Sequence, residues 1–397
     1  MKDNLEYNNK KPKITFVARY YPPTPNINGE AICDMVTYLK EQCNIESNII
    51  CMDRSFEGGG RRREPVGNVI KLKSLSQSNN KILRFITFLY DGWALTRKSK
   101  RFKDTFIVTT SSPPLLPFWA SMMYGRKYNW AFWSLDLFPE GFSATNMISE
   151  NNRFYKWVIK KTYNSNPRLL IALGPKPHEH LERKFQKELP AAILPCGVFF
   201  YQDKSEQKPA WFDSSKTTFG YCGNIGDAHN PAFIREVANQ IDPETQQIVL
   251  ALYGHKAPKL KESLAHQEGI IMVETVPRDQ LHFIDIHLVT LYKKWTHIAV
   301  PSKAISAVTM NGALLFAGSK ESDNWHMLQD SGWLIEEGED LKKQVTNFMN
   351  TLTQEALEKR KQRTPELLVE LQEMVLNSYN MVATYANQYA DEKEIQL

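Results

Sequence analysis

Val300-Pro301-Ser302-Lys303, followed by the mostly apolar residues 304–308, is the stretch around which this chain is organised. Pro301 and Ser302 favour the start of a helix, because proline fits a first turn and serine caps free N–H groups. Lys303 then places a cation beside the positive end of the helix dipole, which is unfavourable unless an anion also binds there. A phosphate-bearing ligand explains this arrangement. An exposed lysine in an ordinary first turn is the alternative.

The composition is that of a globular protein with two domains. The chain has 397 residues, of which 42% are hydrophobic, so it is long enough for two cores. A net charge of +5 suits an anionic substrate or an anionic membrane surface, and it gives no reason to expect nucleic-acid binding. The five cysteines contain no Cys-x-x-Cys pair, so we expect reduced thiols in the cytoplasm.

Neither a targeting segment nor a membrane span is expected. Residues 1–13 are polar and charged, unlike a signal peptide. No window reaches the roughly eighteen consecutive apolar residues of a membrane-spanning helix. Residues 81–101 combine aromatic and aliphatic side chains with flanking Lys and Arg, which is typical of an interfacial helix on an anionic membrane. A core-facing helix with a solvated basic end fits the same pattern.

Apolar runs alternate with helical patterns, which predicts α/β architecture. Residues 14–18 form the first such run, and a turn-rich loop containing Gly29 leads from it into an amphipathic helix. The pattern restarts after the polar linker 202–209. Two doubly wound domains with a ligand cleft between their carboxyl edges are therefore expected. Buried strands are predicted at 47–52, 105–110, 130–135, 169–173, 192–198, 217–222, 248–252, 270–273, 286–291, 312–318 and 332–335.

The order of the motifs resembles that of GT-B glycosyltransferases, in particular the family 4 branch that builds bacterial exopolysaccharides and surface polysaccharides. These motifs are the strand and loop 16–31, Ser111-Ser112-Pro113-Pro114-Leu115, Asp136-Leu137-Phe138-Pro139-Glu140, Gly223-Asn224-Ile225-Gly226 and Val300-Pro301-Ser302-Lys303.

The resemblance implies two Rossmann-like domains facing across a cleft. Residues 1–203 would bind the acceptor, residues 210–370 would bind the nucleotide sugar, and the helix 371–397 would pack back on the first domain. It also implies a retaining, metal-independent hexosyltransferase without a cofactor. The donor would be a UDP-sugar, UDP-glucose or a relative, and the acceptor a saccharide or a lipid-linked saccharide. Such an enzyme would be cytoplasmic or peripheral at the inner face of the plasma membrane.

The diphosphate of such a donor needs positive charge where its leaving group forms. The sequence has no Asp-x-Asp motif to hold a metal ion, so side-chain cations and backbone N–H groups must supply that charge. Lys303 and Ser302 are the first candidates, and Lys256 and Arg19 are second. Glycine permits close approach of the backbone to phosphate, which adds Gly29, Gly223 and Asn224.

Two further donor positions follow from the resemblance. The main chain around Val276 would contact the nucleobase. Ser306 stands where the family usually has a Glu that holds the ribose hydroxyls, and a hydroxyl offers less than a carboxylate there. Asn311 replaces a glycine at the end of the same helix, and asparagine tolerates left-handed backbone.

On the acceptor side, Asp136 is the candidate carboxylate that orients or deprotonates the attacking hydroxyl. A structural role, in which Asp136 caps the next segment, is equally compatible with the sequence. Glu140 can serve instead or pair with a surface cation, and Arg19 belongs to the same group of candidates. Trp295 is the aromatic residue expected to face the cleft. We predict no metal site at His178-Glu179-His180, because residues two apart on a helix point to different faces.

A non-catalytic GT-B relative that binds sugar or acts as a scaffold is the alternative function, and Ser306 in place of Glu favours it. A sugar-phosphate-handling enzyme of the same fold, such as an epimerase, would need a further acid–base pair that the sequence does not reveal.

Overall fold

The structure is a computed structural model. It describes residues 13–55, 62–78, 80–125, 127–198, 200 and 204–394. Residues 1–12, on which the signal-peptide prediction rests, lie outside the described residues.

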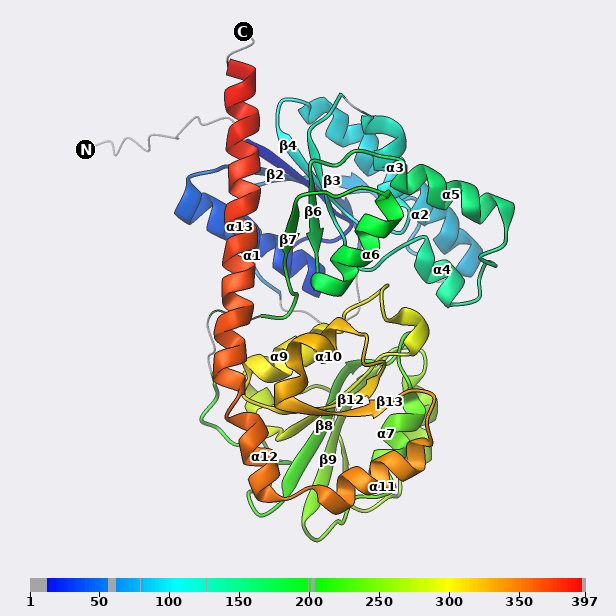
Figure 1. Cartoon of the computed structure of the whole chain (residues 1–397), viewed down its shortest axis with the longest axis vertical. Coiled ribbons are helices and arrows are strands. Elements are labelled where there is room, and N and C mark those ends of the chain that lie inside the picture. Colours follow the sequence, from blue (N-terminus) through cyan, green and yellow to red (C-terminus); the bar gives the residue numbers. More distant parts are fainter. Residues whose placement is uncertain are drawn as a thin grey trace, which may run out of the picture.

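The amino-terminal half is built on a seven-stranded parallel sheet in the order β3-β2-β1-β4-β5-β6-β7 (Figure 1). The strands are β1 (Ile14–Val17), β2 (Ser47–Asp53), β3 (Asn68–Lys73), β4 (Phe106–Thr110), β5 (Trp130–Trp133), β6 (Leu169–Ala172) and β7 (Ala191–Ile193). The helices are α1 (Ile27–Cys43), α2 (Lys81–Ser99), α3 (Leu116–Tyr124), α4 (Glu140–Ala144), α5 (Arg153–Tyr163) and α6 (Pro175–Phe185), with a 3₁₀ turn, η1 (Lys100–Phe102), after α2.

The carboxy-terminal half repeats this plan on a six-stranded parallel sheet in the order β10-β9-β8-β11-β12-β13. Its strands are β8 (Thr217–Asn224), β9 (Gln246–Tyr253), β10 (Ile270–Met272), β11 (Ile286–Thr290), β12 (Ala313–Gly318) and β13 (Gly332–Glu336). Its helices are α7 (Pro231–Ala238), α8 (Ala257–Leu264), α9 (Ser302–Thr309), α10 (Asp323–Leu328), α11 (Leu341–Thr351), α12 (Gln354–Lys361) and α13 (Thr364–Glu394), with 3₁₀ turns η2 (Arg278–Phe283), η3 (Lys293–Trp295) and η4 (Gln329–Ser331).

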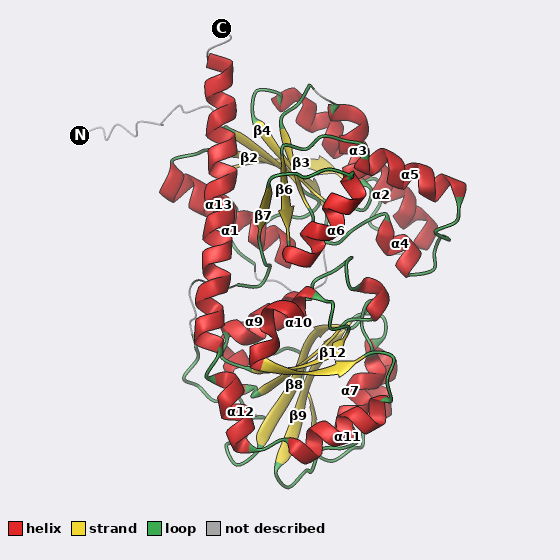
Figure 2. Ribbon diagram, viewed as in Figure 1, coloured by secondary structure: helices red, strands yellow, loops and turns green. Residues whose placement is uncertain are grey.

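The predicted doubly wound α/β architecture is therefore confirmed, with helices around each sheet (Figure 2). Strand β3 was not predicted. It lies at the edge of its sheet, where Lys71, Lys73 and Asn68 alternate with apolar residues and remain half-buried or exposed. An edge strand of this kind lacks the continuous apolar run that marks a central parallel strand.

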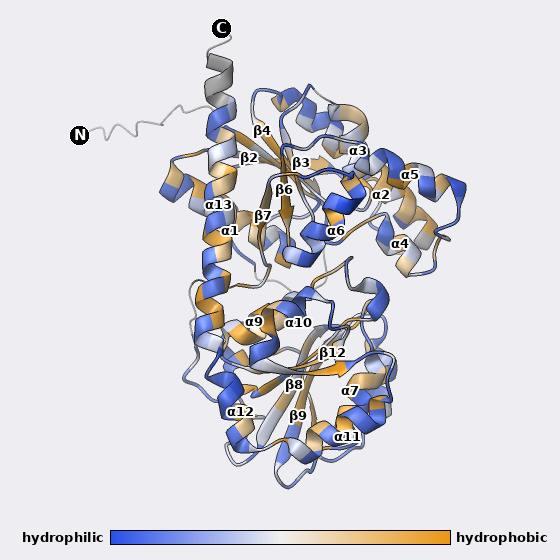
Figure 3. Cartoon of the chain, in the orientation of Figure 1, coloured by the Kyte–Doolittle hydropathy of each residue, from blue (hydrophilic) through white to orange (hydrophobic). Residues whose placement is uncertain are grey.

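The cores lie between each sheet and its helices. Trp130, Phe132 and Trp133 are buried in the first half, as the sequence predicts, and Trp119 is partly buried. Hydrophobic residues follow the strands of both sheets, whereas α12 is largely hydrophilic (Figure 3). Burying these apolar strands supplies the main favourable free energy of folding.

The long helix α13 crosses from the second half to the first (Figure 1). Leu367 and Leu371 near its start pack with residues of the second half. Val375 and Tyr379 instead belong to the core of the first half. The Ser378 hydroxyl donates a 2.6 Å hydrogen bond to the carbonyl of Ile193 at the end of β7. The helix thus joins the two halves.

Helix α2 has one face in the core and apolar residues at its exposed start. Phe88 and Leu95 face the core, whereas Ile82 is 72% exposed and Ile86 is 44% exposed. No helix of the described ranges combines the length and the apolar character needed to cross a bilayer.

Candidate functional site

Helix α9 begins at Ser302, with Pro301 in the position before it. No side chain caps its first turn, so the first amides and the positive end of the helix dipole have no side-chain acceptor at Ser302. Lys303 lies in this first turn, as predicted.

The Lys303 side chain reaches the carboxyl end of β8. Its ammonium donates to the carbonyl of Asn224 at 3.2 Å and lies 5.0 Å from the centre of the Tyr221 ring. Burial lowers the pKa of Lys303 to about 8, and the neighbouring Cys222 partly opposes this shift. Among the described residues no salt bridge to a carboxylate pairs this desolvated cation, which favours binding of an external anion.

His229 completes this cluster, and sequence reasoning missed it. Burial and the nearby Lys303 and Lys256 lower the pKa of His229 to about 2, so its ring is neutral. Its Nδ1 accepts a 3.2 Å hydrogen bond from the amide of Gly226, which places the single ring proton on Nε2. Nε2 lies 3.3 Å from the Lys303 ammonium. Two donors thus converge, an arrangement that an anionic acceptor would stabilise.

Gly223 and Asn224 belong to the same site, as predicted. Gly223 has a positive φ of 139°, and a Cβ there would lie 2.6 Å from Cε of Lys303. The glycine therefore makes room for the lysine, in addition to any ligand. Gly254, at the end of β9, packs on the side chain of Asn224.

Lys256 is also brought into the cluster. Its ammonium donates to the carbonyl of His229 at 3.0 Å and lies 5.1 Å from the centre of the Tyr292 ring. Val276 is buried after β10 with Val249 and Ala251, and Cys222 packs on the same cluster. The Val276 side chain is therefore part of the core, and a contact of its main chain with a nucleobase stays a prediction.

The first half contributes Asp136, directly after the strand β5. The Leu137 amide donates to the carbonyl of Ile298 at 2.8 Å, which brings this segment against the chain that leads into α9. Solvent reaches Asp136, yet the surrounding protein desolvates its carboxylate and raises its pKa to about 6. Helix α4 has Pro139 as its cap residue and no side-chain cap, so Asp136 does not act as a cap. A carboxylate with this pKa suits proton transfer near neutral pH.

A second contact between the two halves lies beside Val276. Arg278 donates hydrogen bonds of 2.9 and 3.2 Å to the two carboxylate oxygens of Glu30. Glu30 follows Gly29 in the first turn of α1. The first turn of α1, which contains Gly29, is thereby held opposite the edge at which Val276 lies.

Solved structures of glycosyltransferases share this architecture, although no family model and no curated protein matches the sequence. Sucrose-phosphate synthase from Thermosynechococcus elongatus superposes with a TM-score of 0.70 at 12% identity, covering 96% of this chain and 100% of that one. An α,α-trehalose-phosphate synthase (UDP-forming) from Burkholderia xenovorans, in complex with glucose-6-phosphate, gives 0.65 at 13%, covering 94% and 100%. WaaG, a glycosyltransferase involved in lipopolysaccharide biosynthesis, gives 0.59 at 14%, covering 95% of both chains.

The chain has the GT-B fold. At these sequence identities the likeness establishes the fold alone. Any inference about chemistry must come from the residues of the site. Lys303 and His229 lie in the carboxy-terminal half of this fold, and Asp136 lies in the amino-terminal half. Short contacts join the two halves through Ile298 and Arg278.

Several predicted site residues have other tasks in this GT-B fold. The Ser306 hydroxyl is buried and donates to the Gly197 carbonyl at 3.3 Å, so its proton is not available to a ribose in this arrangement. The Gly29 amide donates to Asn26, which leaves it no N–H for a phosphate. Asn311 does adopt the predicted left-handed backbone, with φ of 65°.

Arg19 and Trp295 are corrected in the same way. Arg19 is buried and pairs with Asp91 at 3.3 Å. Its guanidinium also lies over the ring of Phe88. Trp295 is only 6% exposed, because the 3₁₀ turn η3 directs it into the core with Ile305 and Phe316 instead of the cleft. Both side chains are thus buried, which is not the exposed position expected for contact with an acceptor.

Glu140 is buried rather than at the surface. It accepts a 2.5 Å hydrogen bond from the Tyr163 hydroxyl, and the Lys184 ammonium lies 4.0 Å away. Burial raises the pKa of its carboxyl. His178 contacts Glu182 on its own helix at 3.5 Å. Within the described ranges, no three His, Cys, Asp or Glu side chains converge in a way that could hold a metal ion.

Proposed function

We propose that the chain is a nucleotide-sugar-dependent hexosyltransferase that retains the anomeric configuration and needs no metal ion. In this proposal residues 210–370 bind the donor, residues 1–203 bind the acceptor and residues 371–397 form the helix that packs back. The GT-B fold supports the class of enzyme, and the cluster around Lys303 supports the place of the donor.

The observation that carries the proposal is the convergence of Lys303 and His229. A desolvated ammonium and a neutral imidazole N–H face each other at 3.3 Å, beside the uncapped first turn of α9. A diphosphate oxygen would accept from both groups and would also interact favourably with the helix dipole. Lys256, on the other side of His229, adds a second cation to the same edge.

The proposed reaction breaks the bond between the anomeric carbon and the β-phosphate oxygen. Negative charge develops on that oxygen as the sugar leaves, and Lys303 stabilises it. The acceptor hydroxyl forms the new bond to the anomeric carbon on the same face and gives up its proton. In this proposal Asp136, from the amino-terminal half, orients this hydroxyl and takes the proton.

The finer identity of the substrates belongs to the same proposal. We propose a UDP-sugar, UDP-glucose or a relative, as donor and a saccharide or lipid-linked saccharide as acceptor in polysaccharide biosynthesis. The UDP-forming synthase and WaaG, which share the fold, support this choice. We also propose a cytoplasmic protein that contacts an anionic membrane through α2, because that helix exposes Ile82, Leu83 and Ile86 beside basic residues.

Thermal unfolding with and without UDP tests the donor site. UDP and UDP-glucose are expected to raise Tm, because a ligand that binds only the folded state stabilises it. Lys303→Ala should remove this shift, whereas Lys259→Ala, an exposed lysine on the neighbouring helix α8, should retain it. If no nucleotide diphosphate changes Tm, the donor site is refuted.

A non-catalytic sugar-binding or scaffold role remains the second candidate. Ser306 favours it, because its hydroxyl is already used by Gly197 and no carboxylate stands at that position. Following UDP release from UDP-glucose separates the two roles. An enzyme hydrolyses the donor slowly even without its acceptor, whereas a binding protein shows the Tm shift without any release of UDP.

A further inference from the structure

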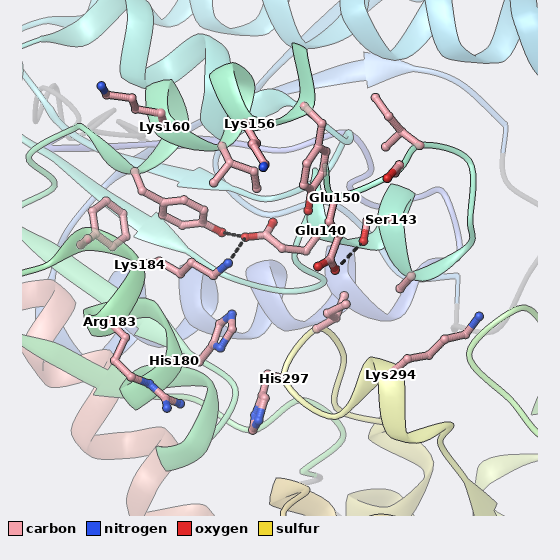
Figure 4. A pocket seen from close by; sticks show the side chains of 18 of the residues that line it. Glu140, Ser143, Glu150, Lys156, Lys160, His180, Arg183, Lys184, Lys294 and His297 are labelled. Carbon is pink, nitrogen blue, oxygen red and sulfur yellow. Dashed lines mark hydrogen bonds and ion pairs between the residues drawn. The ribbon is translucent and has the colours of Figure 1, made fainter. Parts of the chain in front are cut away.

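A large cavity lies between the two halves, on the side of α4, α5 and α6. It measures about 1250 Å³ and is closed from below by residues 293–298 of the second half (Figure 4). This volume exceeds the roughly 300–1,000 Å³ of a typical small-molecule site. The cavity therefore has room for a ligand larger than a single sugar ring.

The charge of its lining is strongly positive. Six cations line it against only two carboxylates, Glu140 and Glu150. In Figure 4 the ammonium groups of Lys156 and Lys184 point towards Glu140. The cations are Lys156, Lys160, Arg183, Lys184, Lys293 and Lys294. Such an excess in a cleft attracts anions, because low-dielectric walls focus the potential.

Polar atoms inside the cavity lack partners among the described residues. Oε2 of Glu140 is buried without a hydrogen bond, although Oε1 accepts one from Tyr163. Nε2 of His180 and Nδ1 of His297 are also buried without partners. The two imidazoles stack with centres 5.2 Å apart, one from each half of the chain. Burial and nearby cations lower the pKa of His180 to about 4, so its ring is neutral. Buried polar atoms without partners cost free energy, which a polar ligand would recover.

Apolar side chains form the remaining wall. Ala144, Ile148, Ile159 and Ile298 line the cavity between the charged groups. A site with cations at one part, a carboxylate oxygen at another and an apolar wall between them fits a ligand that carries phosphate, hydroxyl groups and a less polar face.

We propose that this cavity is the outer part of the acceptor site and that it binds the phosphorylated portion of a saccharide. It adjoins the segment that carries Asp136, because Ile298, which lines the cavity, accepts a hydrogen bond from the amide of Leu137. Lys156 and Lys184 hold the phosphate, Oε2 of Glu140 accepts a hydrogen bond from a sugar hydroxyl, and the two imidazoles bind further polar groups. The inference rests on the proposed transferase function, and it adds the chemical class of the acceptor. The phosphate can belong to a soluble sugar phosphate or to a lipid-linked saccharide diphosphate, since both present the same charge.

A calorimetric titration of the full chain tests this inference with glucose 6-phosphate, glucose and farnesyl diphosphate as probes. Glucose 6-phosphate or farnesyl diphosphate should bind, and glucose should bind more weakly than glucose 6-phosphate. Binding of glucose 6-phosphate alone identifies a soluble acceptor, and binding of farnesyl diphosphate alone identifies a lipid-linked one. Lys156→Gln and Lys184→Gln should each weaken binding about tenfold, because each removes a charge-assisted hydrogen bond. Lys161→Gln, on the same helix α5 but outside the cavity, should leave it unchanged.

The Tm shift with UDP distinguishes failure of this inference from failure of the proposed function. Lys156→Gln and Lys184→Gln should keep that shift, because the donor cluster lies at Lys303. Wild-type affinity in both variants, or no binding of either phosphate-bearing probe, would overturn the acceptor assignment while leaving the donor site intact. If both variants equally lose the Tm shift with UDP, the cavity belongs to the donor. That result would also overturn the acceptor assignment.

Discussion

Arg278 donates two hydrogen bonds to Glu30 and so joins the second half of the chain to the first turn of α1. The side chain of Glu30 is only 5% exposed, and that of Arg278 is 21% exposed. A bidentate pair with this burial fixes both the distance and the orientation of its partners. It therefore fixes the second half of the chain to the first turn of α1.

Glu30→Gln should weaken this link between the two halves of the chain. The neutral amide accepts only one of the two bonds, so we expect a loss of about 1.5–3 kcal/mol in the free energy of unfolding. Chemical denaturation measures that loss, and small-angle scattering should show a larger radius of gyration. Glu339→Gln, at an exposed position, is the control and should match the wild type in both measurements. An unchanged radius of gyration in Glu30→Gln would show that other contacts hold the two halves together.

Gly223→Ala should disrupt the donor cluster. The new Cβ would lie 2.6 Å from Cε of Lys303, and φ of 139° is strained for any residue with a side chain. We expect a cost of about 1–3 kcal/mol in stability and loss of the UDP-induced Tm shift. Gly226→Ala is a matched control in the same loop, because φ there is not positive and the nearest atom is the end of the Asn224 side chain at 3.2 Å. Equal UDP binding in both variants would contradict a close approach at Gly223.

Activity should depend on pH in a bell shape. Asp136 acts as a base only when deprotonated, so kcat/KM should rise as the pH passes about 6. Lys303 supports the leaving diphosphate only when protonated, so the rate should fall as the pH passes about 8. Initial rates from pH 5 to 10 measure both limbs. Asp136→Asn should remove the acidic limb at a much lower rate, and Lys303→Arg should move the alkaline limb upwards. A rate that is flat below pH 7 would exclude Asp136 as the base.

Asp91→Asn should destabilise the first half without direct effect on the donor. Asp91 is fully buried, accepts hydrogen bonds from Ser74 and pairs with the buried Arg19. Removing one charge of such a pair leaves the other uncompensated, which costs about 3–5 kcal/mol. Urea denaturation measures this loss, and Asp53→Asn at an exposed position serves as the control. If Asp91→Asn loses less free energy of unfolding than the control Asp53→Asn, Arg19 must find another partner.

The fold was predictable because its signals are local. Each central strand of a parallel sheet is an apolar run such as Leu169–Ala172, and the turn residues between runs mark the loops. The start of α9 and the glycine at position 223 could be placed for the same reason. Their chemistry follows from the residues next to them in the chain.

The rest of the site depends on directions and distances that the chain order does not contain. His229 was missed, although a histidine in the glycine-bearing loop after β8 was a visible signal. The direction of Trp295 was wrong, because a 3₁₀ turn of three residues has too little periodicity to show which side faces the core. Glu140, His180 and His297 come from three distant segments, and the packing of α4 and α6 against residues 293–298 brings them together.

The path of α13 has a consequence for the order in which the protein folds. Ser378 binds the carbonyl of Ile193 across 185 residues of sequence, and the core of the first sheet includes Val375 and Tyr379. At the usual rate of about 5–20 residues per second, translation of that interval takes roughly 10–40 s. Until then the nascent first sheet exposes the apolar groove that α13 will fill. The earliest part of the polypeptide to be made is therefore among the last to reach its final packing, and a chaperone has time to bind it.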